Sequence, residues 1–213
     1  MRCMSVSPPS DAATASRRAP TAAGFARAGL FHYGRLLGNG YRVLAEVKAA
    51  LAAEPGERVL DVGCGTGGYC VAVPGEYVGI DYDPDYVAFA RWRWGGRRRH
   101  FHVADLAQFN AAAGFDRAML VNCLHHLSDV VAAAVLAKLC QIVRRRVVVV
   151  DADPEASNWL QSFLLRHDRG EFIRPRAVQR ALLAARFVVT AEGRFRNTPH
   201  TVVQTLFVCE PKR

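Results

Sequence analysis

A run of glycines in the segment VLDVGCGTGGYC (residues 59–70) offers a place where a ligand can lie against the backbone. Gly63, Gly65 and Gly67 lack a Cβ atom, so the chain can turn tightly and approach a bound molecule closely. Loops of this kind usually bind phosphate groups through backbone N–H donors. Asp61, two residues before the first of these glycines, would repel a phosphate. The combination therefore favours a cationic ligand that carries no phosphate.

Three further polar positions follow apolar segments, each at the point where a strand is expected to end. Asp81 ends EYVGID, Asp105 ends HFHVAD, and Asn122 ends FDRAMLVN and is followed by Cys123. In an open α/β sheet, ligands bind beyond the carboxyl ends of the strands. Each aspartate taken alone is as well explained by a turn or a helix cap. Their shared position at successive strand ends favours one site around the glycine run.

The elements that would position these residues alternate between strands and helices. Strands are expected at 58–62, 76–81, 100–105, 115–122 and 146–153, followed by two terminal strands at 186–193 and 200–210. Helices are expected at 25–37, 41–53, 84–94 and 128–143, the first two separated by Gly38, Asn39 and Gly40. This order indicates an α/β fold with a doubly wound, mostly parallel seven-stranded sheet and a terminal antiparallel strand pair.

The composition fits a single globular unit. The chain has 213 residues, of which 51% are hydrophobic, enough for a sizeable core. No apolar run reaches the roughly 18 to 20 residues of a membrane span, and no secretory leader is recognisable. The six cysteines form no CxxC pair, which predicts reduced thiols and a cytoplasmic location. The net charge of +9 comes from 25 Arg against 3 Lys, a skew typical of a GC-rich genome, and favours an anionic partner only slightly.

Taken in order, the four segments resemble the motifs of the class I (Rossmann-like) S-adenosylmethionine-dependent methyltransferases, within a small bacterial subgroup. VLDVGCGTG is similar to motif I, and the resemblance runs from Arg58 to Asp153. It implies that S-adenosylmethionine is the cofactor, with S-adenosylhomocysteine as product. This nucleoside carries a sulfonium and an ammonium group and no phosphate, as the glycine run requires.

The resemblance also assigns roles to the strand ends. Asp81 would bind the two ribose hydroxyls, Tyr82 would pack on the adenine, and Asp105 with Leu106 would bind its edge. Asn122 and Cys123 would approach the methionine part. The implied cofactor contacts are Asp61, Gly63, Cys64, Gly65, Gly67, Asp81, Tyr82, Asp105, Leu106, Asn122 and Cys123. Two departures stand out: the helix after Gly67 is short, and the Pro-Gly-Gly turn common before the fifth strand is missing.

Methyl transfer is an in-line displacement that needs a positioned nucleophile and sometimes a general base. The candidate base is His125 or His126 in LHHL, with Asp151 or Asp153 of the neighbouring strand orienting the imidazole. The catalytic residues are therefore expected among His125, His126 and Asp151. A histidine that caps the following helix or packs beneath the loop is an equally good reading.

The acceptor is expected to be a small molecule, and an anionic one would fit the arginines below, since arginine binds carboxylate or phosphate groups in a bidentate manner. The expected acceptor contacts are Tyr33, Asp168, Arg169, Arg174, Arg196 and His200. Ion pairs that hold the C-terminal segment against the sheet explain these arginines equally well. In FHYGRLLGNGY, Tyr33 or His32 would face the cofactor from a lid, although a packing helix is the simpler interpretation.

The expected organisation is a disordered tail (1–22) and one methyltransferase domain (23–213). The domain divides into N-terminal helices (23–55), a cofactor-binding core (56–153) and an acceptor-side segment with the terminal strands (154–213). We expect a monomer or a homodimer without a metal site, because the His and Cys residues lack ligand spacing.

Two other functions stay open. RWRWGGRRRH (residues 91–100) carries Trp92 and Trp94 among arginines, a pattern that suits stacking on nucleic acid, so an RNA or protein methyltransferase is the first alternative. Tryptophans that pack on the sheet explain the stretch more simply, and nucleic acid is not the expected partner. The second alternative is a protein that binds S-adenosylmethionine without transferring its methyl group.

Overall fold

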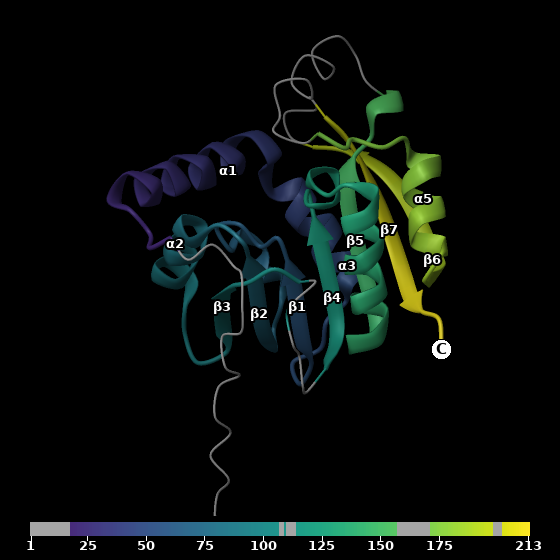
Figure 1. Cartoon of the computed structure of the whole chain (residues 1–213), viewed down its shortest axis with the longest axis horizontal. Helices are drawn as coiled ribbons and strands as arrows, with labels where there is room; N and C mark the ends of the chain where they lie inside the picture. Colours follow the sequence, from purple (N-terminus) through teal and green to yellow (C-terminus); the bar gives the residue numbers. More distant parts are fainter. Residues whose placement is uncertain (1–17, 107–108, 110–113, 157–170, 198–201) are drawn as a thin grey trace, which may run out of the picture.

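The computed structural model describes residues 18–106, 109, 114–156, 171–197 and 202–213, and the strands in these ranges form one seven-stranded sheet (Figure 1). The parallel strands are β1 (Arg58–Val62), β2 (Glu76–Asp81), β3 (Arg99–Val103), β4 (Phe115–Val121) and β5 (Val143–Ala152). The antiparallel strands β6 (Phe187–Arg196) and β7 (Val203–Pro211) complete the order β3-β2-β1-β4-β5-β7-β6. The predicted fold class is confirmed.

Helices cover both faces of the sheet, so consecutive residues of the central strands are buried on both sides. On one face, α1 (Ala22–Leu51) and α2 (Pro84–Trp94) pack with Val59 and its neighbours; on the other, α3 (Asp129–Ile142) and α5 (Arg176–Ala184) pack with Leu60. Three single turns of 3₁₀ helix complete the description: η1 (Gly68–Ala72), η2 (Leu124–His126) and η3 (Pro154–Ala156). The turn η1 is the short helix that the sequence predicts after Gly67.

Strand register brings the carboxyl ends of the central strands to one level. Val62 pairs with Ile80, and Val121 pairs with Val150. The loops that follow β1, β2, β4 and β5 therefore meet at one edge of the sheet, where ligands of such folds bind. We call this edge, with the residues that directly follow these four strands, the carboxyl edge.

The N-terminal region differs from its prediction. Residues 22–51 form one continuous helix, α1, instead of two helices separated at residues 38–40. Glycine in a helix costs only about 1 kcal/mol relative to alanine, which packing on either side of the interruption offsets. Ala28 packs in the first half of α1, and Val47 and Leu51 are fully buried in the second half.

Both ends of α1 are capped. The Thr21 hydroxyl accepts the Gly24 N–H at 3.0 Å, and the helix ends at Leu51 because Ala52 turns into the left-handed region with φ +45°. Thr21 also donates its backbone N–H to Asp85 at 2.8 Å. This contact lies inside the predicted tail (1–22), of which residues 1–17 are outside the described ranges. Among the described residues, no helix is both long enough and apolar enough to cross a membrane.

Candidate active site

The glycine run follows β1 and is tied to the neighbouring strand. The backbone N–H groups of Gly63 and Cys64 both donate to the Ile80 carbonyl, at 2.9 and 3.0 Å. Gly63, Gly65 and Gly67 have φ values of +69°, +51° and +75°, a region that residues with a side chain enter only at a cost. The sequence needs glycine here for the conformation of the loop itself.

Gly67 and Gly65 differ in the space that lies beside each of them, where a side chain would stand. A Cβ on Gly67 would lie 2.6 Å from Cε1 of Phe101, so packing forbids a side chain there. A Cβ on Gly65 would meet its nearest heavy atom, Cδ2 of Tyr86, only at 4.0 Å. Gly65 therefore leaves room for a molecule to lie against the loop.

Asp81 closes β2 beside this open position. Its Oδ2 accepts the Gly65 N–H at 2.8 Å and its Oδ1 accepts the Asp83 N–H at 2.9 Å. Each carboxylate oxygen has a second lone pair that can accept a further hydrogen bond. Burial raises the pKa of this carboxyl above its usual range, while the backbone hydrogen bonds oppose the shift. The position suits the predicted contact with two neighbouring hydroxyls.

Asp61 has a different environment from the one that its sequence position suggests. Its side chain is buried and accepts the Tyr77 hydroxyl at 2.6 Å, within the layer covered by α1. Burial and the Asp61 charge raise the pKa of Tyr77 well above its usual value, so this hydroxyl keeps its proton. Asp61 thus places a negative charge next to the glycine run, and its direct contact with a ligand stays a prediction.

Two of the predicted cofactor contacts are buried cysteines. A Cβ on Gly63 would lie 2.5 Å from Sγ of Cys123, and one on Gly79 would lie 2.9 Å from Sγ of Cys64. Burial raises the pKa of both thiols, so neither is a thiolate at neutral pH. Both sulfurs therefore fill the space that two glycines leave behind the loop.

The remaining predicted cofactor residues lie along the same edge. Tyr82 is 73% exposed, Asp105 is half-buried, and Leu106 is buried. Asn122 follows β4 with φ +52°, and the described residues offer no hydrogen-bond acceptor to its buried Nδ2. An amide in this position has a donor available for a bound molecule.

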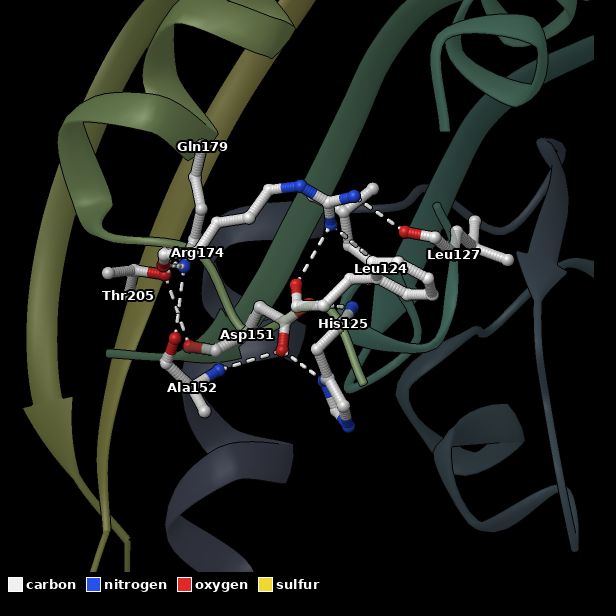
Figure 2. A network of polar contacts seen from close by, with 9 residues as sticks. Leu124, His125, Leu127, Asp151, Ala152, Arg174, Gln179 and Thr205 are labelled. Atoms are coloured by element: carbon white, nitrogen blue, oxygen red, sulfur yellow. Dashed lines mark hydrogen bonds and ion pairs between the residues drawn. The ribbon is translucent and has the colours of Figure 1, made fainter. Parts of the chain in front are cut away.

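The histidine loop after β4 brings His125 onto Asp151 (Figure 2). Both side chains are buried. Nδ1 of His125 contacts Oδ1 of Asp151, and the His125 backbone N–H donates to Oδ2 at 2.9 Å. With Asp151 accepting at Nδ1, that nitrogen carries the proton of the neutral ring and Nε2 has the basic lone pair. The arrangement is that of a general base with an orienting carboxylate.

The structure separates the two adjacent histidines. His126 is exposed, and its ring centroid lies 4.1 Å from that of His125. Asp153, the other carboxylate expected near the histidines, forms an ion pair with Nε of Arg194 at 2.6 Å. Among the candidates for a base, the pairing with a buried carboxylate favours His125.

The predicted acceptor contacts that the structure describes come from three different parts of the chain. Arg174 is buried and binds backbone carbonyls of the histidine loop, so its position does not support the expected role as an anchor for an anionic acceptor. Tyr33 is 54% exposed on α1, and Arg196 is exposed at the end of β6. Asp168, Arg169 and His200 lie outside the described residues.

Two residues support the glycine run in ways that the sequence suggests only weakly. His32 of α1 is buried, and its Nδ1 lies 2.9 Å from the Thr66 hydroxyl. Trp94 donates its indole N–H to the Thr66 carbonyl at 3.1 Å. Trp92 is 67% exposed but packs against Phe25 with ring centroids 5.6 Å apart. Trp94 is therefore bound to the glycine run, whereas Trp92 contacts helix residues and leaves most of its surface exposed instead of packing on the sheet.

Part of the chain is similar to known methyltransferases. Residues 59–146 match the model of a family described as a methyltransferase domain. An O-methyltransferase of Penicillium expansum, cnsE, is 34% identical over 123 residues, which are 53% of this chain and 44% of that protein. A 23S rRNA (uracil(1939)-C(5))-methyltransferase of Xanthomonas euvesicatoria is 37% identical over 90 residues, 37% of this chain and 20% of that protein. The chain thus spans less than half the length of these two relatives.

The fold has a solved counterpart. Magnesium protoporphyrin IX methyltransferase from Synechocystis PCC 6803, crystallised with bound S-adenosylhomocysteine, matches with a TM-score of 0.67 and 19% identity, over 86% of this chain and 94% of that one. Among the described residues, no group of three or more His, Cys, Asp or Glu side chains could hold a metal ion. Residues 59–146 therefore match a methyltransferase domain, and the seven-stranded sheet has the Rossmann-like methyltransferase fold.

Proposed function

We propose that this protein transfers a methyl group from S-adenosylmethionine to the hydroxyl group of a small molecule, with His125 as the general base. The observation that carries the proposal is the buried His125–Asp151 pair at the carboxyl edge. The similarity to a protein named an O-methyltransferase supports an oxygen atom as the nucleophile. When bound, S-adenosylmethionine would supply a sulfonium methyl group, to which an in-line nucleophile bonds as S-adenosylhomocysteine leaves.

The residues of the carboxyl edge fit this cofactor. Gly65 leaves space against the backbone that a Cβ would fill, and Asp81 presents a buried carboxylate to a pair of hydroxyls such as those of ribose. The Nδ2 group of Asn122 is a buried donor that matches the carboxylate of the methionine part. The negative charges of Asp61 and Asp81 suit a cationic nucleoside and disfavour one that carries phosphates.

The His125–Asp151 pair then has a defined task. Asp151 fixes the ring through Nδ1 and through the backbone N–H of His125, so Nε2 is the nitrogen that takes the hydroxyl proton. As the proton moves, the carboxylate stabilises the imidazolium that forms. Burial of both side chains keeps bulk water away from the proton transfer.

Other acceptor contacts belong to the same proposal. Tyr33 and Arg196 are exposed and available to a bound molecule, and Arg196 would favour an anionic one. Asp168, Arg169 and His200 keep their predicted roles as acceptor contacts. A small acceptor, a monomeric or homodimeric protein and a cytoplasmic location stay predictions.

The test compares His125→Gln with the control His100→Gln. His100 is exposed and lies near the start of β3, at the end of that strand away from the carboxyl edge. Each variant is incubated with radiolabelled S-adenosylmethionine and a panel of phenols, catechols and hydroxy acids, and its affinity for S-adenosylhomocysteine is measured by calorimetry. We expect His125→Gln to slow transfer by about 10²- to 10⁴-fold with unchanged affinity. If His125→Gln transfers the methyl group at the parent rate, His125 is not the general base. If His126→Gln loses more activity than His125→Gln, His126 is the base instead.

An RNA methyltransferase is the second candidate, favoured by the similarity to a 23S rRNA methyltransferase. Trp92, which is 67% exposed between two arginines, provides a surface on which a base can stack. Ribosomal RNA bound with an affinity that falls steeply with salt, together with label in that RNA, would favour this function. Tight cofactor binding without any labelled product would instead favour a protein that does not transfer the methyl group.

A further inference from the structure

A buried polar network joins the His125–Asp151 pair to the segment before α5 and to β7 (Figure 2). It starts at the histidine loop, which follows β4, and ends at Thr205. Its side chains other than the pair are Arg174, Gln179 and Thr205, and each of them is at most 7% exposed. The methyl-transfer chemistry described above assigns no task to these three side chains.

Arg174 holds the backbone on both sides of His125. Its Nη1 donates to the Leu124 carbonyl at 2.9 Å and to the Phe172 carbonyl at 3.1 Å, and its Nη2 donates to the Leu127 carbonyl at 2.5 Å. Asp129 accepts from both Nε and Nη2 at 2.8 Å. These five contacts equal the number of N–H donors on a guanidinium. The fork geometry of Arg174 therefore fixes the loop at residues 124 and 127.

The same segment also binds the loop at His125 itself. The backbone N–H of Phe172 donates to the His125 carbonyl at 2.9 Å. Together with the two carbonyls that Arg174 binds, three of the four carbonyls from residue 124 to residue 127 are held by residues 172 and 174. Rotation of the His125 backbone would break several of these contacts at once.

Gln179 holds the other partner of the pair. Its Nε2 donates to the Ala152 carbonyl at 2.9 Å and to the Arg174 carbonyl at 2.7 Å. Its Oε1 accepts the Thr205 hydroxyl at 2.7 Å, and this hydroxyl also lies 3.1 Å from the Asp151 carbonyl. The amide thus connects the backbone that follows Asp151 with the backbone that presents the Arg174 side chain.

We propose that Arg174 and Gln179 are positioning residues that keep the His125 ring on the Asp151 carboxylate. The inference rests on the proposed function, since an oriented ring matters only if His125 accepts a proton. Stability alone does not call for a buried guanidinium, because apolar residues of similar volume often serve as well or better. A base that must present one nitrogen to its substrate needs both partners of its pair held in place.

The ring tautomer of His125 is the decisive measurement. With Asp151 accepting at Nδ1, the neutral ring carries its proton there, whereas an unconstrained imidazole exchanges between both forms. Nitrogen-15 NMR of the ring, recorded where the imidazole is neutral, distinguishes the two tautomers. The spectrum of His125→Gln identifies the relevant signals among those of the seven histidines. The measurement needs no acceptor, so its failure is distinct from a failure of the proposed methyl transfer.

Arg174→Lys and Asp129→Asn form a matched pair of variants. Lysine keeps the positive charge near Asp129 but loses the fork that binds the loop carbonyls. Asp129, whose side chain is 82% exposed, binds the Arg174 guanidinium at the surface and none of the loop carbonyls. We expect Arg174→Lys to mix the tautomers and to slow transfer by about 10²-fold with unchanged affinity for S-adenosylhomocysteine. Asp129→Asn is expected to keep the parent tautomer and at least about half of the parent rate.

Gln179→Met and Thr205→Val give the same test from the β5 side and replace Arg174→Lys if that variant does not fold. Mixed tautomers in either variant, in a protein whose thermal unfolding is still cooperative, support the proposal. A parent-like tautomer in the folded variants of Arg174 and Gln179 overturns it, even when their melting temperatures fall. Equal mixing in Asp129→Asn also overturns it, because the surface ion pair would then hold the ring.

Discussion

Gly65→Ala tests whether the open side of the glycine run is where the cofactor lies. The backbone of Gly65 has φ +51°, and forcing a residue with a Cβ into this region costs about 1 to 2 kcal/mol. No steric cost is added, because the nearest heavy atom to the new Cβ is 4.0 Å away. For a chain of this size, the melting temperature should fall by about 2 to 8 °C.

The effect on ligand binding should be larger than this modest loss of stability suggests. The Gly65 N–H is bonded to Asp81 at 2.8 Å, so a ligand that binds this carboxylate must pass within contact of Gly65. A methyl group there would displace it, and we expect the affinity for S-adenosylhomocysteine to fall at least about tenfold, or about 1.4 kcal/mol. Titration calorimetry measures the affinity, and thermal unfolding measures the stability of the same sample.

Gly114→Ala is the matched control for Gly65→Ala. Gly114 also has a positive φ, +65°, but it precedes β4 and lies at the opposite end of the strands. Its new Cβ would also lie 3.2 Å from the Ile142 carbonyl oxygen, so this control should lose at least as much stability as Gly65→Ala and keep the parent affinity. The reasoning is refuted if Gly65→Ala binds S-adenosylhomocysteine as tightly as the parent, or if Gly114→Ala loses the same affinity.

Three further substitutions test how individual side chains contribute to the stability of the fold. Gly67→Ala should destabilise the fold by about 2 to 5 kcal/mol in denaturant unfolding, because the left-handed backbone cost adds to overpacking against Phe101; a loss below about 1 kcal/mol would contradict this. Burial raises the pKa of Asp81 in the folded protein, so folding favours the protonated carboxyl. The stability that Asp81 contributes is therefore present at low pH and is lost as pH rises through the pKa of the folded state. The stability of the parent relative to Asp81→Asn should therefore fall as pH rises from about 4 to about 7, and a difference that stays constant would refute the assignment. Arg117→Met removes one of the two arginine partners of buried Glu57, while Arg145 stays 2.6 Å from the other carboxylate oxygen, so the loss in unfolding experiments should be about 1 to 3 kcal/mol; a larger loss would contradict a shared pairing.

The strands and most helices could be predicted because local signals and burial agree along this chain. The β2 and α2 boundaries at Glu76, Asp81, Pro84 and Trp94 match the prediction to the residue. Proline at the first helical position and an apolar run before Asp81 each point to the same boundary. Where such signals conflict, prediction fails: residues 38–40 read as a break, yet packing along α1 keeps the helix continuous.

Which of two adjacent histidines pairs with a carboxylate could not be predicted. Both precede the same helix and neighbour the same strand, and only the conformation of η2 directs His125 inward and leaves His126 exposed. The role of Arg174 was equally hidden. Its partners at residues 124 and 127 lie about 50 positions earlier in the chain. They are backbone carbonyls, which every residue type carries, so the sequence does not indicate them.

The negative charge near the glycine run is accommodated by hydrogen bonds to three buried carboxylates. Asp61 receives a tyrosine hydroxyl, Asp81 receives two backbone N–H groups, and Asp151 receives a histidine with its backbone N–H. In each of these contacts the acid is bound by N–H or O–H groups. A salt bridge would have cancelled the field that attracts a sulfonium nucleoside. Hydrogen bonds from neutral donors stabilise the same charges and leave that field in place for the ligand.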